Sequence, residues 1–158
     1  MPVVYADTSA LFAYLHPRDE FAAVVTAATR ESAPDFVYWA FLRFELRHNL
    51  RRSRTDRYGE IAWRALRAAE RTRNRLRWED LSCERALESA DNLSEDCALE
   101  TEAGSADLMH VAAARKVAQT SGIDEFWTCD QAQAAAARKA GLSTRLFEPE
   151  KAPRRPAA

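Results

Sequence analysis

Four acidic residues stand where a carboxylate could act on a substrate. Asp7 follows the apolar run V-V-Y-A, and Asp130 follows E-F-W-T-C. Glu45 and Asp107 each share a predicted helix face with apolar side chains, where an unpaired carboxylate is costly. Carboxylates brought together repel one another unless a hard divalent cation holds them, and oxygen-only ligands favour Mg²⁺ or Mn²⁺ over zinc. Such a site hydrolyses phosphodiester bonds without a covalent nucleophile.

Each of these acids also has a simpler explanation. Asp7 and Asp130 could each cap the helix that follows them. Glu45 and Asp107 could each form a buried salt bridge with an arginine. His110 lies one turn after Asp107 and could hydrogen-bond to it, although a core histidine with satisfied hydrogen bonds fits the same pattern. From the residues alone, both sets of explanations stay open.

Two hydroxyl groups lie close to the strand-end acids in sequence. Ser9 and Thr128 are each two residues from one of them, so their hydroxyls could orient a carboxylate or a metal-bound water. A helix cap also explains Ser9, and an ordinary strand threonine explains Thr128. The sequence has no G-x-x-x-x-G-K-[ST], G-x-G-x-x-G or G-x-S-x-G motif, so nucleotide-binding and α/β-hydrolase chemistry lack their signatures.

Charge is segregated along the chain although its net value is only −1. Residues 43–77 contain 12 Arg and four acids, whereas residues 79–107 contain ten acids and one Arg. Of the 23 basic residues 20 are Arg, whose planar guanidinium suits phosphate or carboxylate recognition. The arginine-rich stretch could therefore hold a polyanion, or it could form salt bridges with the acidic segment.

The elements that would position these side chains alternate along the chain. Such alternation predicts an α/β fold with a central parallel sheet of about four to five short strands flanked by helices. Strands are predicted at 3–6, 36–39, 125–129 and 144–147, and helices at 8–15, 19–30, 41–51, 55–76, 82–99, 105–119 and 131–140. The longest helix carries an arginine stripe, and Ser82 and Ser105 are expected to be N-caps.

The length of 158 residues predicts a single domain. We place it at residues 1–148, followed by a flexible or partner-bound Pro/Arg-rich tail at 149–158. Three cysteines without a C-x-x-C spacing argue against a disulfide framework or a zinc site. No apolar stretch approaches the ~20 residues that span a bilayer, and no signal-peptide pattern is present, so we expect a cytoplasmic protein with no membrane partner.

Four segments together resemble the PIN-domain ribonucleases, and within that family the VapC-type toxins of bacterial toxin–antitoxin modules. They span residues 3–142 in the order that the family has. The segments are V-V-Y-A-D-T-S-A-L, F-L-R-F-E-L-R-H-N-L-R, A-D-L-M-H-V-A-A-A and E-F-W-T-C-D-Q-A-Q-A-A-A-A-R-K-A-G-L.

The resemblance implies a three-layer PIN-like fold and an acidic quartet around Mg²⁺, for which Mn²⁺ could substitute. Asp7, Glu45, Asp107 and Asp130 match the quartet, with Asp7 and Asp107 the surest ligands, and Ser9 and Thr128 match the supporting hydroxyls. It also implies a homodimer and a VapB-like antitoxin that blocks the site. Three residues depart from the family's usual pattern, Cys129, Ala132 and Ala135, and leave the shape of the neighbouring pocket open.

The leading hypothesis is therefore a Mg²⁺-dependent endoribonuclease, the toxin of a toxin–antitoxin pair. Arg47, Arg64 and Arg71 are the candidates for contact with RNA or antitoxin, and phosphate contacts of this kind position a substrate without specifying its sequence. The alternative is a catalytically idle PIN-like module that binds RNA or protein. An aspartyl phosphatase needs a second acid where Ser9 stands, and a receiver domain needs a strand-end lysine, so both fit poorly.

Overall fold

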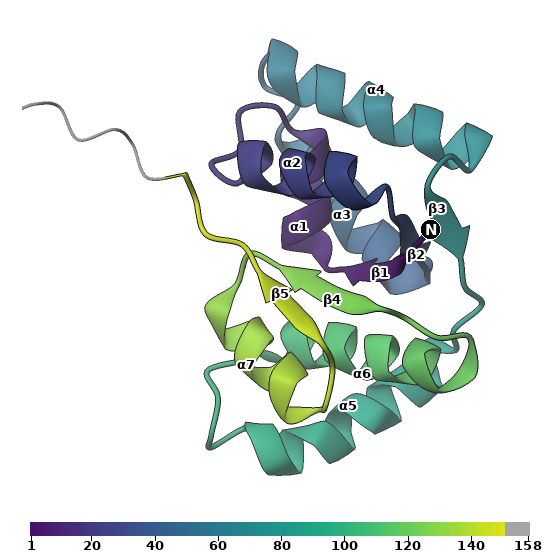
Figure 1. The fold of residues 1–158 in the computed structure, drawn as a ribbon, viewed down its shortest axis with the longest axis vertical. Coiled ribbons are helices and arrows are strands. Elements are labelled where there is room, and N and C mark those ends of the chain that lie inside the picture. The colour runs from purple at the N-terminus through teal and green to yellow at the C-terminus, as the bar shows by residue number, and fades with distance from the viewer. Residues whose placement is uncertain (151–158) are drawn as a thin grey trace, which may run out of the picture.

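A five-stranded parallel sheet runs through the middle of the molecule (Figure 1). The computed structural model describes residues 1–150, so most of the predicted tail, residues 151–158, lies outside the described residues. The strand order is β3-β2-β1-β4-β5. The strands are β1 (Val3–Ala6), β2 (Asp35–Tyr38), β3 (Leu76–Trp78), β4 (Glu125–Thr128) and β5 (Thr144–Leu146).

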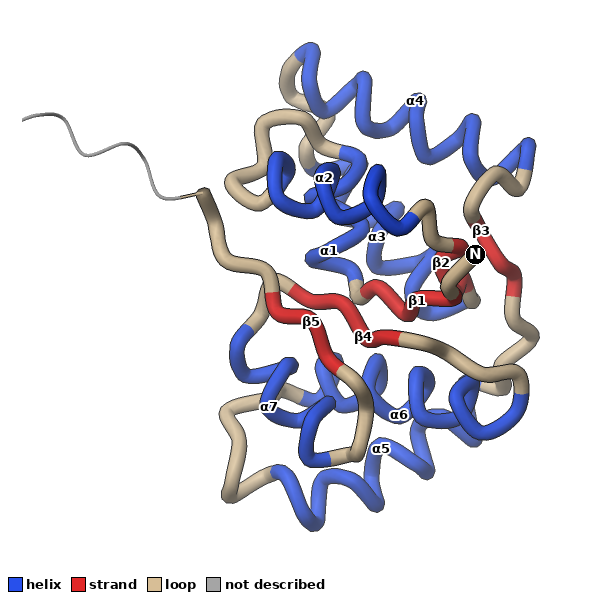
Figure 2. Tube along the Cα trace, in the orientation of Figure 1, coloured by secondary structure: helices blue, strands red, loops and turns tan. Residues whose placement is uncertain are grey.

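Helices cover both faces of this sheet, as Figures 1 and 2 show. One layer consists of α1 (Thr8–Leu15), α2 (Ala22–Ser32), α3 (Ala40–Arg52) and α4 (Arg57–Thr72). The other consists of α5 (Cys83–Cys97), α6 (Ser105–Thr120) and α7 (Gln131–Lys139). The predicted α/β class with three layers is confirmed. Strands covered on both faces are mostly apolar, which is why the centres of β1, β2 and β4 are short apolar runs.

Aromatic side chains of the central strands fill the core. Tyr5 of β1 stacks on Phe126 of β4 with ring centroids 5.5 Å apart. Trp127 meets Phe36 and Phe147 edge to face, at 5.9 and 5.2 Å. In α6, three consecutive alanines at 112–114 are fully buried, because this helix lies between the sheet and α5 (Figure 1). The sheet is therefore a rigid platform for whatever its strand ends carry.

The helix predicted at 55–76 is shorter in the structure. The α4 helix ends at Thr72, because Arg73 and Arg75 adopt left-handed conformations with φ of 54° and 56°. Leu76–Trp78 then forms β3 and pairs with β2. This strand was not predicted, since one leucine between two arginines carries little strand signal by itself. Its formation depends on the partner strand.

Two predicted helix starts also differ. Gly104, not Ser105, is the N-cap of α6, and its backbone N–H donates to the Asp107 carboxylate at 2.8 Å. The second helix begins at Ala22 rather than at Asp19, whose carboxylate instead accepts from the Phe21 N–H at 2.9 Å and stabilises the preceding turn. In both cases an acid that we placed inside the helix satisfies a backbone N–H at its start.

Two further observations bear on the excluded classes. All three cysteines are free. Within residues 1–150, no helix combines the length and the apolar character that crossing a membrane requires.

Candidate active site

The two strand-end acids emerge side by side at one edge of the sheet. Strands β1 and β4 are neighbours, with Ala6 opposite Trp127, and the Asp7 N–H donates to the Trp127 carbonyl at 3.0 Å. The Asp7 carboxylate caps α1 through the Ala10 N–H at 2.8 Å. Asp130 likewise caps α7. Asp7 and Asp130 therefore each cap a helix and also lie at the carboxyl edge of a parallel sheet, where ligands bind.

The other two acids reach the same edge from helices. Asp107 lies in the first turn of α6, where its Oδ2 atom accepts from the Gly104 N–H. Glu45 lies in the middle of α3, and its Oε2 atom accepts from the Thr8 hydroxyl at 2.8 Å and hydrogen-bonds to His110. In the described part of the chain, neither acid forms a salt bridge with an arginine. The salt-bridge explanation for these two residues is therefore not what the structure shows.

All four acids line a single cleft of about 680 Å³. It opens between the layer of α1 and α3 and the layer of α6 and α7, at the carboxyl ends of β1 and β4. A fifth acid, Asp19, also lines it. The remaining polar lining includes Thr8, Ser9, Asn49, Arg52, His110 and Gln133.

The environment of the cleft perturbs the carboxylates. Burial raises the pKa of Asp7, although His110 and the hydrogen bonds that this carboxylate accepts oppose the shift. Burial also raises the pKa of Asp107, with further contributions from the nearby charges of Asp130 and Glu45. Burial raises the pKa of Glu45 too, but the hydrogen bonds from His110 and Thr8 outweigh it and lower the pKa overall. Repulsion between these acids is what a bound cation would relieve.

The two candidate hydroxyls both hold Asp7 in place. Ser9 Oγ donates to the Asp7 carboxylate at 2.7 Å and accepts from the Cys129 N–H at 3.0 Å. Thr128 Oγ1 lies 2.7 Å from Asp7 Oδ2 and accepts from the Asp130 N–H at 3.0 Å. These hydroxyls link the end of β1 to the end of β4, so the position of Asp7 is fixed from two strands.

The donor set of the cleft fits a hard divalent cation, but the ligands are not already gathered. Among residues 1–150, no group of three or more His, Cys, Asp or Glu side chains stands ready to hold a metal ion. Helix capping uses only Oδ2 of Asp107 and Oδ1 of Asp130. Their second oxygens have no hydrogen-bond partner within the described chain. Carboxylate oxygens from four acids around one cleft are the donor type that suits Mg²⁺ or Mn²⁺.

Four site residues were missed or undervalued in the sequence. Thr8 binds Glu45, and His110 is both a buried core residue and part of the cleft. Gln133 is 1% exposed, and its amide lies 3.1 Å from the Thr128 hydroxyl and 3.4 Å from the Asp107 carbonyl. The sequence marked it only as one of two glutamines at the start of an alanine-rich helix, with nothing to distinguish it from Gln131. Arg52 lines the cleft, but among 12 arginines of one segment nothing in the sequence marked it out.

The arginines that the sequence suggested lie elsewhere. Arg47 forms a two-point ion pair with Glu70 at 2.8 and 2.7 Å, and Arg64 pairs with Glu60 at 3.1 Å. Arg71 is an exposed residue of α4. None of these three is among the residues that line the cleft.

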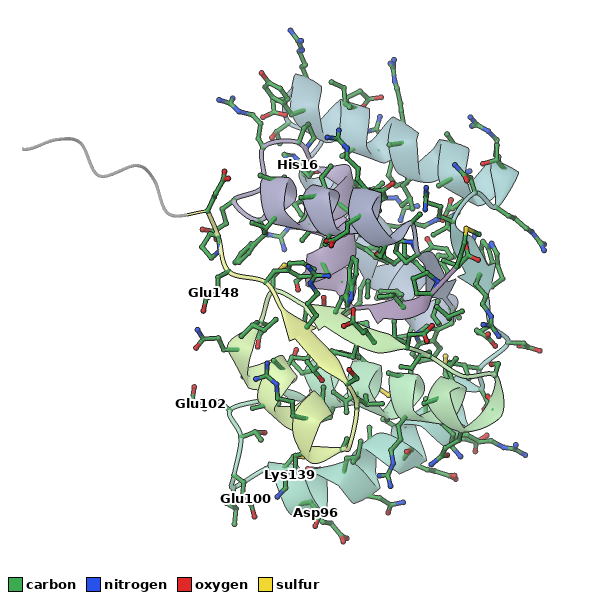
Figure 3. All side chains as sticks on the ribbon, in the orientation of Figure 1. His16, Asp96, Glu100, Glu102, Lys139 and Glu148 are labelled. Atoms are coloured by element: carbon green, nitrogen blue, oxygen red, sulfur yellow. The ribbon has the colours of Figure 1, made fainter. Side chains whose placement is uncertain are left out.

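Cys129 lines the cleft and Lys139 lies outside it, and both bear on which chemistry is available there. Burial and the charge of Asp7 raise the pKa of Cys129 to about 12, so its thiol is a poor nucleophile at neutral pH. Lys139, at the end of α7, pairs with Glu100 beyond the end of α5 (Figure 3). No lysine of the described residues lines the cleft, in keeping with the poor fit to a receiver domain.

Comparisons with known proteins agree with this architecture. The family model described as PIN domain matches residues 4–139. Among solved structures, Mycobacterium tuberculosis VapC20, described as a Sarcin-Ricin loop cleaving toxin, is 22% identical with a TM-score of 0.62, covering 84% of this chain and 94% of that one. A search of curated protein sequences finds no match.

Two further solved structures share the fold. VapBC2 from Rickettsia felis, bound to a DNA fragment from its promoter, is 13% identical with a TM-score of 0.58, covering 92% of this chain and 99% of that one. FitAcB from Neisseria gonorrhoeae is 16% identical with a TM-score of 0.52, covering 90% and 95%. At these identities, the similarity shows a shared fold and nothing more.

Proposed function

This chain belongs to the PIN domain family, and from that premise we propose that it is a metal-dependent endoribonuclease, the toxin of a toxin–antitoxin pair. One observation carries the proposal. Four carboxylates, from the ends of two adjacent parallel strands and from two helices on opposite faces of the sheet, line one cleft. Acids that repel one another at the carboxyl edge of a sheet suit phosphodiester hydrolysis with a divalent cation.

We assign the cation to Asp7 and Asp107, with Glu45 and Asp130 completing the acidic set. When bound, Mg²⁺ or Mn²⁺ would neutralise charge on the attacked phosphate and lower the pKa of the water that attacks it. Neighbouring residues of the chain hold these carboxylates in position. Capping and hydroxyl contacts hold Asp7, and the Gly104 N–H at the start of α6 holds one oxygen of Asp107.

We assign the RNA backbone to the end of α3 that borders the cleft. Arg52 lines the cleft beside Asn49, and within the described chain it forms no salt bridge. A guanidinium there can contact a phosphate next to the scissile one without reading sequence. Of the earlier candidates, Arg47 already gives two N–H groups to Glu70. Arg64 gives only its Nε–H to Glu60 and its side chain is 78% exposed, so it keeps donors for an RNA phosphate outside the cleft.

We also propose a VapB-like antitoxin and a homodimer as partners. Both follow from the resemblance to VapC-type toxins, and the structural neighbour VapC20 is itself described as a toxin. Light scattering of the purified protein, alone and after co-expression with the gene immediately upstream, tests both assemblies.

The test of the function is cleavage of total RNA by the purified chain, freed of antitoxin, with Mg²⁺, with Mn²⁺ and with EDTA. Asp107→Asn is assayed in parallel because the amide keeps the shape of the side chain and removes its charge. Asp91→Asn, an exposed acid of α5 away from the cleft, is the matched control. We expect metal-dependent cutting in wild type and in the control, and none in Asp107→Asn.

Full activity in Asp107→Asn, or cutting that survives EDTA, would overturn the assignment. The fragment ends from the wild-type reaction would begin to identify the substrate RNA.

One observation favours the alternative, a PIN-like module that binds RNA or protein without cutting it. The acids of the described chain do not form a ready ligand group. Calorimetry with Mn²⁺ distinguishes the two functions: a nuclease binds the ion and Asp107→Asn weakens the binding, whereas an idle module shows no binding in either protein.

A further inference from the structure

A chain of hydrogen bonds runs from the core of the protein to the cleft. Trp39 Nε1 donates to the Tyr5 hydroxyl at 2.8 Å, and that hydroxyl lies 3.0 Å from His110 Nδ1. His110 Nε2 in turn contacts Glu45 Oε2. Trp39 and Tyr5 are 0% exposed and His110 is 3% exposed, so water does not compete for these bonds. This series of hydrogen bonds thus connects the fully buried side chains of Trp39 and Tyr5 to Glu45, one carboxylate of the acidic set.

The direction of each bond follows from counting protons. The indole of Trp39 can only donate, so it uses a lone pair of the Tyr5 oxygen. The Tyr5 hydroxyl must then donate its own proton, and His110 Nδ1 is its only remaining neighbour among the described residues. A proton on Nδ1 would leave the buried hydroxyl without an acceptor, at a cost that folded proteins avoid.

The other ring nitrogen gives the same answer. A bare Nε2 would set its lone pair against the Glu45 carboxylate, whereas an Nε2–H donates to it. The Thr8 hydroxyl, which donates to the same oxygen of Glu45, lies 3.2 Å from Nε2 and can share that proton. Both ends of the imidazole therefore require the proton on Nε2.

We propose that His110 is the positioning residue for Glu45, fixed in its Nε2–H tautomer by Tyr5 and Trp39. This role rests on the proposed function to the extent that Glu45 serves a metal site. His110 and Thr8 hold Oε2 from two sides, and Oε1 has no partner within the described chain. The carboxylate thus keeps one oxygen for the cleft. A histidine–carboxylate arrangement of this kind orients a ligand without touching substrate.

The ring itself is clamped by aromatic neighbours. Phe41 lies 5.3 Å from the His110 ring centroid and Tyr5 lies 6.0 Å from it, edge-on. Rotation of the imidazole would break both hydrogen bonds and disturb these contacts. The orientation of Glu45 in α3 is therefore set by β1, by α6 and by Trp39, the N-cap of α3.

The tautomer is measured directly by long-range ¹H–¹⁵N correlation spectra of the ¹⁵N-histidine-labelled full chain at about pH 8.5, where a free imidazole is neutral. The spectrum of His110→Gln, in which one set of signals is missing, assigns the ring. Exposed His48 is the internal control and should show a mixture of tautomers. We expect His110 to show a protonated Nε2 and a bare Nδ1. In Tyr5→Phe we expect Glu45 to keep the proton on Nε2, while the Nδ1 signal shifts because that nitrogen loses its hydrogen bond. A proton on Nδ1 in wild type would overturn the proposal.

The functional arm compares two substitutions of the same residue. His110→Gln keeps an N–H donor near Nε2, whereas His110→Leu keeps bulk and removes the donor. We expect Leu to lower kcat and Mn²⁺ affinity by about 10- to 100-fold with little change in KM for RNA, and Gln to retain most of both. Equal losses in the two variants would contradict a positioning role. Melting curves of both variants confirm that each is folded.

The outcomes separate this inference from the proposed function. If wild type neither cuts RNA nor binds Mn²⁺, the nuclease proposal fails, while the tautomer of His110 and its response to Tyr5→Phe still decide whether the ring orients Glu45. If wild type is an active nuclease and His110→Leu matches it in kcat and Mn²⁺ affinity, the nuclease proposal stands and the positioning role is refuted.

Discussion

Thr128 offers the sharpest test of how the sheet edge holds its acids. It is fully buried at the end of β4, where its hydroxyl contacts Asp7 Oδ2 at 2.7 Å and accepts from the Asp130 N–H at 3.0 Å. Thr128→Val keeps the size and shape of the side chain but removes the hydroxyl. Thr128→Ser keeps the hydroxyl and removes one methyl group. The pair therefore separates hydrogen bonding from packing.

The expected magnitude follows from the two bonds that are lost. A hydrogen bond to a charged group contributes about 1.5–3 kcal/mol and a neutral one about 0.5–1.5 kcal/mol, so the valine variant should lose about 2–4 kcal/mol. For a chain of this length that corresponds to a drop in Tm of about 5–15 °C. The serine variant should lose about 1 kcal/mol, for one buried methyl group.

The penalty should also depend on pH. Burial already raises the pKa of Asp7 above its ordinary value of 3.8, and the Thr128 hydrogen bond is one of the contacts that oppose the shift. Removing the hydroxyl raises the folded pKa further. An acid whose pKa is raised on folding loses stability as pH rises from the unfolded value through the folded one. The difference between wild type and Thr128→Val should therefore be smallest in acid and largest at neutral pH.

Thermal unfolding followed by circular dichroism, in EDTA and at several pH values, measures all three proteins. If valine and serine are equally destabilising, packing and not hydrogen bonding holds this edge. A valine variant as stable as wild type, or one whose deficit shrinks as pH rises, would refute the reasoning about Asp7.

Further predictions concern residues outside the acidic quartet. A Cβ on Gly59 would lie 1.8 Å from the Ser53 carbonyl oxygen, so Gly59→Ala should cost about 3 kcal/mol or more in urea unfolding; an unchanged midpoint contradicts this. Arg52→Ala should weaken RNA binding and reduce the salt slope by about one, whereas Arg51→Ala, which alters a residue stacked on a tryptophan, should not; equal slopes would remove Arg52 from the interface. Glu70 is 6% exposed and pairs with three arginines, so Glu70→Gln should cost about 3 kcal/mol. Burial raises the pKa of Glu70 but the arginine contacts lower it more, so wild type should lose this stability as pH falls, and a pH-independent difference would speak against the pairing.

Much of the architecture could be predicted because its causes are local. Short apolar runs predicted β1, β2 and β4, since the central residues of a strand covered on both faces are mostly apolar. The strand-end position of Asp7 and Asp130 followed from the same runs, and the parallel sheet then required their side chains to share an edge. Glu45 and Asp107 stood out because they share a helix face with apolar residues, where an unpaired carboxylate is costly to bury.

Other features depended on partners distant in the chain. Leu76–Trp78 becomes a strand because β2 offers a free edge, and nothing in L-R-W announces it. The charge distribution along the sequence identified a basic segment. It did not show that Arg47 forms a salt bridge with Glu70 while Arg52 lines the cleft. Salt bridges are decided by which helices pack together, and α3 and α4 must be folded before these choices exist.

The sequence by itself predicted the fold class and marked the four acids and the hydroxyls of Ser9 and Thr128 as candidates, because periodicity and strand ends are properties of short segments. Only the tertiary structure decided how those acids are held. The proton arrangement of Trp39, Tyr5 and His110 arises where β1, the start of α3 and α6 meet, and it acts on Glu45 further along α3. Buried hydrogen bonds must be satisfied as a set, and that set exists only once the elements have packed.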